Sequence, residues 1–462
     1  MIAQTIKNIL GAQGYALKKL PPLIRDINKS RKLKSLSDRR KRLEDLKSTY
    51  KDNYLVLLEY SNLLMATNSD QFLHSLTNLF ESYNNQLENY FGRSDLIYFA
   101  NPNTVIGSLG NINTLVALDR AINNNIIPSA KVLVPSPAKS YFSNPTLIKI
   151  IVNSCSAIQI LNEEESWFHL ESMQEHIQYP LGLGFFFDEK AMFLEAGLNY
   201  IRFRELQSSH SPDALTKLQL TSELNAKGLE EIAKLGLGPD DWFVILHVRE
   251  TGYRGETISN TQESWRNADV CDYIPACLKI VEAGGVVIRM GDKSMKPLPH
   301  IPNVIDYAHS PLKTALLDVY LCAKAAFALG TASGVYAVAQ FFGTPCILTN
   351  TAVWSPYFGL TENDYFLPRT LYSKEKKRKL EPVESLCSPL AYANKDWHFS
   401  QRDISWSINK PIEITELTVQ VLKELGLKSG TAELETISLE DQTYEDFWNI
   451  KLNGLARTLS AN

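Results

Sequence analysis

The sequence is poor in the patterns that mark several classes of protein. Its 462 residues include only 6 cysteines, and no two of these form a CxxC pair, so a zinc ribbon or a dense disulfide framework is not expected. No run of about 18 apolar residues occurs, which argues against a transmembrane helix. The first residues, MIAQTIKNIL, lack the apolar core and cleavage site of a secretory signal. We expect buried, reduced thiols in a cytoplasmic protein.

Charge is nearly balanced overall but not along the chain. The net charge of −4 argues against a general nucleic-acid coat, so no nucleic-acid partner is expected. Residues 1–51 hold 14 Lys/Arg against 4 Asp/Glu, or +10, which leaves 33 basic and 47 acidic residues, or −14, for the remainder. A basic amphipathic head of this kind suits an anionic membrane surface, and it equally suits a helical arm packed on the body.

Apolar spacing divides the chain into four parts. Leucines and isoleucines repeat at helical intervals up to residue 90, and short apolar runs alternate with helical patterns beyond it. Strands that alternate with helices predict parallel, doubly wound sheets, here two of them. The predicted parts are a basic helical extension at 1–90, an N-terminal Rossmann-like domain at 91–235, a C-terminal Rossmann-like domain at 236–380, and a helix with a tail at 381–462.

The second alternation is the more regular one. The first contains the strands DLIYFA, AKVLVP and AIQIL, whereas the second contains WFVILHV, VVIRMG, NVIDY, AFALG and PCILTN. The helical segment PLKTALLDVYLCAKA is expected to begin at Pro311, because proline favours a first helical turn. The run KEKKRK from Lys374 is expected to be a solvated loop. The second pattern is typical of a nucleotide-binding half.

Ligands of open α/β sheets bind outside the carboxyl ends of the strands. In the second alternation each of these ends carries polar residues or glycine, so we expect the donor-binding and catalytic residues among them. They are His247, Arg249 and Glu250 after the first strand, Arg289, Gly291 and Asp292 after the second, Asp306 after the third, and Gly330, Thr331, Ala332, Ser333 and Gly334 after the fourth.

The turn GTASG, from Gly330 to Gly334, passes from a strand into a helix. Free backbone N–H groups and the helix dipole favour an anion at such a helix start, and Thr331 and Ser333 add hydroxyl donors. We expect this turn to bind a phosphate or diphosphate. The alternative is that Ser333 is an ordinary helix cap.

Arg249 lies two residues beyond His247, so strand alternation places both side chains on one face. A guanidinium binds a diphosphate bidentately and offsets the charge that develops on a leaving nucleotide. His247 is expected to contact the nucleoside or a phosphate. The alternative is a structural histidine at a strand end.

Carboxylates near these strands have two interpretations. Glu250 and Glu256, in the polar loop from Thr251 to Arg266, are candidates for a general base that reaches an acceptor hydroxyl. Each is equally explained as an acidic loop residue. Arg289, Asp292 and Asp306 are candidates for reading the base or ribose, with loop capping by Asp292 and local packing by Asp306 as the alternatives.

The first alternation carries one glycine-bearing turn, Gly107-Ser108-Leu109-Gly110-Asn111, between a strand and a helix. Gly107, Gly110 and Asn111 are candidates for the acceptor side of a cleft, and a simple tight turn is the alternative. The sequence contains no HExxH, HxH or strand-terminal DxD motif, so no metal site and no bound cofactor are expected, and it contains no GxSxG serine-hydrolase motif.

Five stretches between Trp242 and Asn350 resemble a bacterial family of glycosyltransferases. They are LHVRE, RNADVCDYIPA, GGVVIRMGDKSM, IPNVIDYAHS and LGTASGVYAVAQFFGTPCILTN. The HxR step also resembles the donor motif of fucosyltransferases of the nodulation and protein O-fucosyl types. Those enzymes often have a second arginine where this chain has Glu250, so GDP-fucose itself does not follow.

The resemblance implies two facing Rossmann-like domains, the GT-B arrangement, and metal-independent transfer from a nucleoside-diphosphate sugar. Arg249 would bind the diphosphate, His247 the nucleoside side, and Thr331 to Gly334 the phosphates. The expected acceptor is a glycan, a lipid-linked sugar or a protein in bacterial surface polysaccharide or glycoconjugate synthesis, with inversion at the anomeric carbon. The expected location is cytoplasmic or peripheral on the inner membrane. The alternatives are a nucleotide-sugar epimerase of the same fold and a non-catalytic protein that binds sugar nucleotides or polysaccharide.

Overall fold

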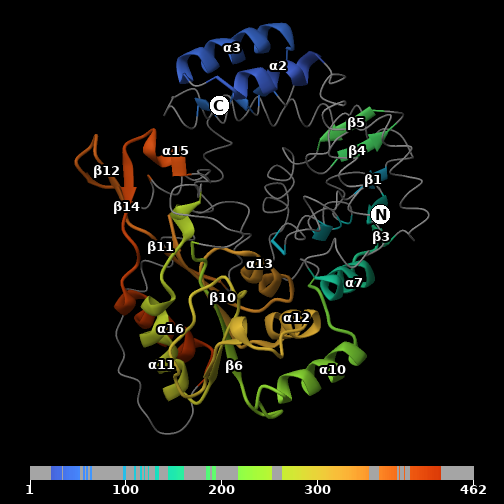
Figure 1. Ribbon diagram of the computed structural model, residues 1–462, viewed down its shortest axis with the longest axis vertical. Helices are drawn as coiled ribbons and strands as arrows, with labels where there is room; N and C mark the ends of the chain where they lie inside the picture. The colour runs from blue at the N-terminus through green and yellow to red at the C-terminus, as the bar shows by residue number, and fades with distance from the viewer. Residues whose placement is uncertain are drawn as a thin grey trace. The chain divides into compact units, whose positions relative to one another are not determined.

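Figure 1 shows the computed structural model of the chain. The structure describes residues 22–33, 35–51, 144–160, 217–251, 263–352, 364–381 and 396–427, with short pieces at 56–57, 59–60, 63–64, 97–99, 109–110, 115–116, 119, 123, 131–134, 184–187, 190–193, 384 and 390.

The chain divides into two compact units, and both are discontinuous in sequence. The first comprises Met1–Ile106, Ala117–Tyr141 and Ala157–Glu205, and the second comprises Gly107–Val116, Phe142–Ser156 and Leu206–Asn462. This division differs from the predicted boundary at residue 235. Three helices predicted to lie outside the C-terminal Rossmann-like domain belong to the second unit: α7 (Pro145–Ser154), α10 (Ser222–Ala233) and α16 (Pro411–Glu424).

A six-stranded parallel sheet forms the centre of the second unit. Its spatial order is β8-β7-β6-β9-β10-β11, which is the 3-2-1-4-5-6 order of a Rossmann sheet. The five strands predicted for this sheet are confirmed as β6 to β10, and β11 was not predicted. The strands are β6 (Phe243–His247), β7 (Val286–Arg289), β8 (Val304–Ile305), β9 (Phe327–Gly330), β10 (Cys346–Thr351) and β11 (Tyr365–Pro368).

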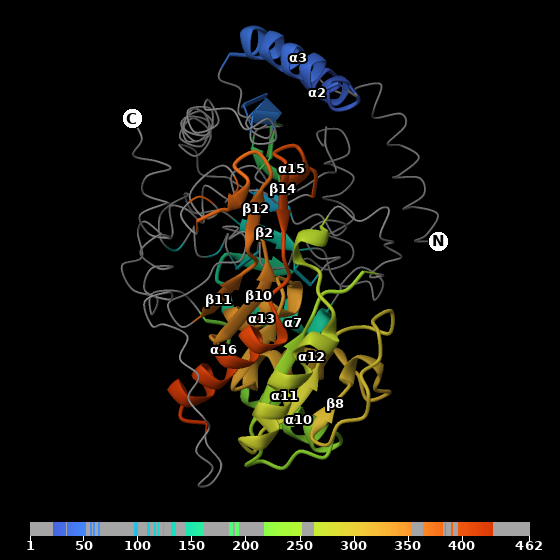
Figure 2. The ribbon, with the colours of Figure 1, turned by 90° about the vertical axis from the view of Figure 1, so that its left-hand side faces the viewer.

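Helices cover both faces of this sheet (Figures 1 and 2). Val244, Leu246 and Val248 alternate along β6 and just beyond it, and they join one buried cluster with residues of α11 (Ile274–Glu282) and α16. Figure 1 shows α10, α12 (Ala315–Lys324) and α13 (Gly334–Phe341) on the other side of β6. The unit is therefore doubly wound, and the α/β class predicted from the alternation is confirmed.

The predicted start of α12 is wrong. The helix begins at Ala315, because Thr314 caps it: the Leu317 amide donates to Thr314 Oγ1 at 3.1 Å. Pro311 lies in the preceding turn instead.

A three-stranded antiparallel sheet, in the order β13-β12-β14, extends the second unit. Its strands are β12 (Leu371–Ser373), β13 (Arg378–Lys379) and β14 (Ile404–Trp406). The predicted KEKKRK loop is the exposed turn and short second strand of the β12–β13 hairpin. The ring of Trp406, in β14, packs edge to face on that of Phe399 at 5.0 Å within one apolar cluster.

The first unit holds a five-stranded sheet in the order β3-β2-β1-β4-β5. The strands β1 (Ile97–Phe99), β2 (Lys131–Val134) and β3 (Ile158–Ile160) are parallel, as predicted. The strands β4 (Gly184–Phe187) and β5 (Lys190–Phe193) form an antiparallel hairpin on β1, so this sheet is mixed rather than parallel.

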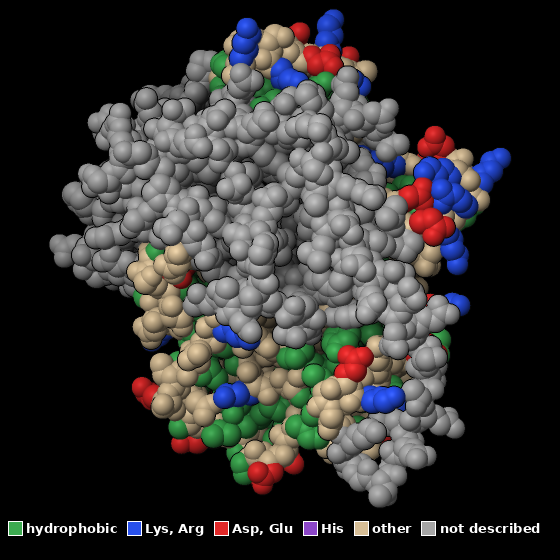
Figure 3. Space-filling model, turned by 180° about the vertical axis from the view of Figure 1, so that it is seen from behind, with side chains coloured by type: hydrophobic (Ala, Val, Ile, Leu, Met, Phe, Trp, Pro, Cys, Tyr) green, Lys and Arg blue, Asp and Glu red, His purple; other side chains and the backbone are tan. Residues whose placement is uncertain are grey.

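The predicted basic head includes α2 (Pro22–Arg31) and α3 (Leu36–Thr49), and the arginines of α3 have carboxylate partners. Arg39 pairs with Glu59, Arg40 with Glu44 and Arg42 with Asp26, each at 3.0 Å. Figure 3 shows Lys and Arg side chains beside Asp and Glu side chains on these helices, at the top of the view. Within the described residues, the structure has no helix with the length and apolar character that a membrane span requires.

Packing of α10 on α12 yields a test of this fold. A Cβ added at Gly228 would lie 1.9 Å from Cδ2 of Tyr320. We expect Gly228→Ala to lower the free energy of unfolding by about 1–3 kcal/mol, although alanine ordinarily favours a helix, because the ring must move. Gly238→Ala is the matched control, since its Cβ would meet Asp241 at an ordinary 3.5 Å. Urea unfolding measures both, and an unchanged or raised stability in Gly228→Ala would contradict the packing.

Candidate functional site

The carboxyl ends of β6 and β9 lie side by side at the point where the strand order reverses. His247 pairs with Gly330 in the sheet, and the Thr331 amide donates to the His247 carbonyl at 3.0 Å. The Arg249 amide in turn donates to Thr331 Oγ1 at 2.8 Å. The two motifs singled out in the sequence, HVRE and GTASG, thus meet at the topological switch point, where open α/β sheets bind their ligands.

Gly330 is required for this meeting. Its φ is +151°, and a Cβ there would lie 1.8 Å from the His247 carbonyl oxygen. A backbone contact cannot give way as a side chain does, so only glycine permits β9 to end this close to β6.

The hydroxyls of the turn have structural roles. Thr331 is 1% exposed, and its Oγ1 accepts the Arg249 amide; its donation to a ligand stays a prediction. Ser333 is the N-cap of α13, where its Oγ accepts the Tyr336 amide at 3.3 Å. This is the capping role that the sequence left as an alternative. Ala332 is buried, and its carbonyl accepts from Arg266 Nη1 at 3.0 Å.

The start of α13 is the anion-binding feature of this turn. Helix geometry leaves the first-turn amides, those of Gly334 and Val335, without acceptors inside the helix. They are aligned with the positive end of the helix dipole.

The predicted glycine turn of the first alternation reaches the same place. A Cβ at Gly334 would lie 2.6 Å from the Gly110 amide nitrogen and 3.1 Å from the Leu109 carbonyl carbon. The turn at Leu109–Gly110 and the first residue of α13 are therefore in backbone contact within the second unit. Gly107, Asn111 and Glu256 lie outside the described residues.

Three arginines gather around the segment 263–267, which precedes α11. Arg249 is 6% exposed; it donates to Asn267 Oδ1, and its Nη2 lies 3.6 Å from the Glu263 carboxylate. Arg266 pairs with the same carboxylate and holds Ala332 of the turn. Arg369 donates to the carbonyls of Asn350, Ser264 and Asn267, and burial lowers the pKa of its guanidinium to about 10.

The sequence did not single out Glu263, Arg266, Asn267 or Arg369. Glu263 and Arg266 are three residues apart, a spacing that joins side chains within one helical turn and was the available signal. Arg369 follows the unpredicted strand β11, so no strand-end rule pointed to it.

Asn350 fixes the position of Arg369. It is fully buried with a φ of +51°, at a register shift where β10 meets β11. Its side chain donates to Tyr273 Oη at 3.0 Å and accepts the Asn409 amide at 2.7 Å, while its carbonyl accepts from Arg369 Nε at 2.8 Å. These bonds offset the cost of a left-handed conformation in a residue other than glycine.

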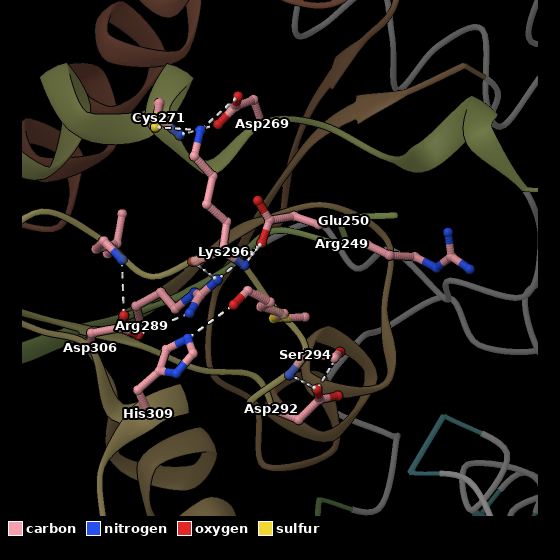
Figure 4. A network of polar contacts seen from close by, with 12 residues as sticks. Arg249, Glu250, Asp269, Cys271, Arg289, Asp292, Ser294, Lys296, Asp306 and His309 are labelled. Atoms are coloured by element: carbon pink, nitrogen blue, oxygen red, sulfur yellow. Dashed lines mark hydrogen bonds and ion pairs between the residues drawn. The ribbon is translucent and has the colours of Figure 1, made fainter. Parts of the chain in front are cut away.

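Arg289 is the centre of a separate polar network (Figure 4). It is 0% exposed and donates to Asp306 at 2.9 Å, to Glu250 at 3.1 Å and to the Lys296 carbonyl at 2.9 Å. The expectation that Arg289 reads the nucleotide is corrected, because its guanidinium is enclosed by protein partners that compensate a buried charge.

Glu250 belongs to this network. Its carboxylate accepts from Arg289 and from the Lys296 amide at 3.2 Å, and burial raises the pKa of the Glu250 carboxyl. Figure 4 shows the Glu250 side chain directed towards Arg289, whereas the neighbouring Arg249 side chain extends away from it. Glu250 therefore anchors Arg289, and its use as a general base stays a prediction without geometric support.

The loop after β7 also has its own partners. Asp306 accepts the Leu298 amide at 3.0 Å, and Asp292 accepts the Ser294 amide at 2.8 Å. Gly291 has a φ of +151°, and a Cβ there would lie 2.2 Å from Met295 Sδ. The shape of this loop thus depends on Gly291, Asp292 and Asp306. Loop capping by Asp292 and local packing by Asp306 are the roles that the sequence offered as alternatives to nucleotide binding.

His247 lies in an apolar and positively charged setting. Among the described residues its Nδ1 has no hydrogen-bond partner, and it is buried. Burial, reinforced by the charges of Arg289 and Lys313, lowers the pKa of His247 to about 3. The His247 ring is therefore neutral near pH 7.

Comparisons with known proteins give no relative in sequence. No family model matches the chain, and no curated protein does, so the fucosyltransferase-like relationship is not confirmed. Solved structures that resemble it include a glycosyl transferase of family 9 from Veillonella parvula, at 11% identity over 71% of this chain and 96% of that one, with a TM-score of 0.36.

Two E. coli structures are similar at the same level. ADP-heptose lipopolysaccharide heptosyltransferase II is 12% identical over 69% of this chain and 97% of its own, with a TM-score of 0.38. A heptosyltransferase with ADP is 14% identical over 57% of this chain and 91% of its own, with a TM-score of 0.27.

The pKa of His247 predicts a dependence of stability on pH. Its folded pKa of about 3 lies below the ordinary 6.5, so only the unfolded chain takes up this proton between the two values. The contribution is complete above pH 6.5 and is lost as the pH falls towards 3. We expect the drop in unfolding free energy from pH 7 to pH 5, measured in urea, to be about 2 kcal/mol smaller in His247→Gln than in the wild type. The exposed His300→Gln is the control, and an equal drop in all three proteins would contradict the assignment.

The contact between Gly110 and Gly334 predicts an asymmetric pair of variants. A Cβ at Gly334 meets backbone at 2.6 Å, whereas a Cβ at Gly110 meets its nearest atom at 3.4 Å. We expect Gly334→Ala to weaken pyrophosphate binding at least about tenfold, since the start of α13 must shift, and Gly110→Ala to change it little. Isothermal titration calorimetry measures both, and equal affinities would show that the two segments do not pack this closely.

Proposed function

We propose that this chain is a glycosyltransferase that takes its sugar from a nucleoside-diphosphate sugar. The diphosphate binds at the start of α13, beside Arg249 and Arg266. The observation that carries the proposal is the bonding at the switch point, where the Arg249 amide donates to Thr331 and Arg266 donates to Ala332. These bonds hold two guanidinium-bearing segments against one helix start.

The charge of the site suits this ligand. Arg249, Arg266 and Arg369 supply three positive charges, and Glu263 and Asp396 supply two negative charges. The net charge of these five side chains is +1, which favours an anionic ligand, and guanidinium groups bind phosphate bidentately. The arginines and the helix start thus supply the charge stabilisation of the reaction, so transfer proceeds without a divalent cation.

The reaction is a displacement at the anomeric carbon. An acceptor hydroxyl forms the new C–O bond while the bond from the anomeric carbon to the diphosphate oxygen breaks, and the hydroxyl proton passes to a base. Negative charge then builds on the departing nucleoside diphosphate, where Arg249 and the α13 amides stabilise it. A single displacement inverts the configuration of the sugar.

The sequence resemblance supports a glycan, glycolipid or protein acceptor in bacterial surface polysaccharide or glycoconjugate synthesis. The proposed location is cytoplasmic or peripheral on the inner membrane, with residues 1–51 as the contact to an anionic membrane surface.

Removal of Arg249 tests this function. We expect Arg249→Ala to lower the rate of sugar transfer about 10²-fold or more, as for the loss of one charge-stabilising donor. Initial rates are measured with ADP-, GDP-, UDP- and CMP-sugars, with and without EDTA, and EDTA is expected to leave them unchanged. Arg249→Lys retains the charge without the fork and serves if the alanine variant folds poorly.

The matched control is Arg378→Ala, which removes an arginine from the exposed pair with Glu384. Near-normal transfer by both Arg249 variants would remove this residue from the mechanism. Binding of a nucleotide sugar without any transfer or hydrolysis would instead favour a non-catalytic protein, and turnover of the donor without an acceptor would favour an epimerase.

A further inference from the structure

The Glu263 carboxylate occupies the space between the two arginines of the site. It pairs with Arg266 and lies 3.6 Å from Arg249 Nη2. The Glu263 side chain is 24% exposed, while those of Arg249 and Arg266 are 8% and 20% exposed. The Glu263 carboxylate is therefore more exposed to solvent than either guanidinium group that it contacts.

We propose that the Glu263 carboxylate occupies the position of the anionic ligand in the free protein. It pairs there with Arg249 and Arg266, and the phosphates replace it when a nucleoside diphosphate binds. This inference rests on the proposed function and concerns the regulation of the same site. The shared chemistry is that of an anion accepting hydrogen bonds from guanidinium groups, which carboxylates and phosphates both do.

The exchange requires only a side-chain movement, because other groups fix the backbone that follows Glu263. The Ser264 and Trp265 amides donate to the Asp396 carboxylate at 3.0 and 3.1 Å. Arg369 holds the carbonyls of Ser264 and Asn267. A rotation of the Glu263 side chain thus breaks its pairs with Arg249 and Arg266 while the segment that follows stays in place.

Electrostatics explains both states. Without a ligand, two poorly exposed guanidinium groups beside a helix start repel one another, and a carboxylate between them lowers that cost. With a diphosphate present, the same carboxylate is a like charge beside the ligand, and such juxtapositions are costly at an interface. Glu263 therefore stabilises the empty site and weakens the filled one.

The test compares Glu263→Gln with Glu263→Asp. We expect Glu263→Gln to bind inorganic pyrophosphate and ADP about tenfold more tightly than the wild type in calorimetry, because the competing charge is gone. Glu263→Asp retains the charge and is expected to bind within about twofold of the wild type. Without ligand, the thermal midpoint of Glu263→Gln is expected to fall below that of Glu263→Asp.

The control is Glu282→Gln, which removes a carboxylate from the exposed pair with Lys279 and is expected to leave binding unchanged. Glu263→Ala serves as a second charge-removing variant if the glutamine variant folds poorly. If the wild type binds and both charge-removing variants bind equally or more weakly, Glu263 only positions the arginines and the inference is overturned. If neither the wild type nor any variant binds pyrophosphate or nucleotides, the proposed function itself fails.

Discussion

The site depends on the hydrogen bonds that join the carboxyl ends of β6 and β9. The Thr331 amide bonds to His247, and the Arg249 amide bonds to Thr331 Oγ1. Neither bond forms unless β9 ends against β6, and Gly330 is the residue that allows this approach. The strand order reverses at this point, which is where open α/β sheets bind their ligands.

Buried charge is arranged in two ways in the second unit. Around Arg289, two carboxylates and a carbonyl compensate the guanidinium within the protein. Around Arg249, Arg266 and Arg369, the carboxylate of Glu263 pairs with the first two, that of Asp396 acts electrostatically on Arg369, and a side-chain amide and backbone carbonyls supply further acceptors. In the first set, two carboxylates neutralise the one guanidinium, whereas the second set retains net positive charge beside a helix start. Burial by itself thus does not separate structural from functional arginines; the balance of charge does.

The sequence predicted the second unit well because its signals were local. Apolar runs gave five of the strands, and the rule about carboxyl ends brought Arg249 and Thr331 together correctly. It failed for Arg289, since a strand-end arginine looks the same in sequence whether it faces solvent or three acceptors within the protein. It missed Arg369 because the position of that side chain depends on a hydrogen bond to Asn350. Asn350 in turn is bonded to Asn409, and no local sequence pattern reveals a contact between residues 59 positions apart. The start of α12 was misplaced because proline and threonine both favour helix starts, and here the cap at Thr314 prevails.

The packing of α16 on α11 also affects how the protein forms during synthesis. Ile414, Leu417, Val421 and Leu422 of α16 complete the apolar cluster that begins with Val244 of β6. Until the ribosome has released the segment Pro411–Glu424, one face of the Rossmann sheet lacks its cover. The same unit already contains Gly107–Val116 and Phe142–Ser156 from the earlier half of the chain. The early segments therefore complete their packing only after the late ones have been synthesised. Such non-local contacts slow folding, and they leave apolar surface exposed to chaperones in the meantime.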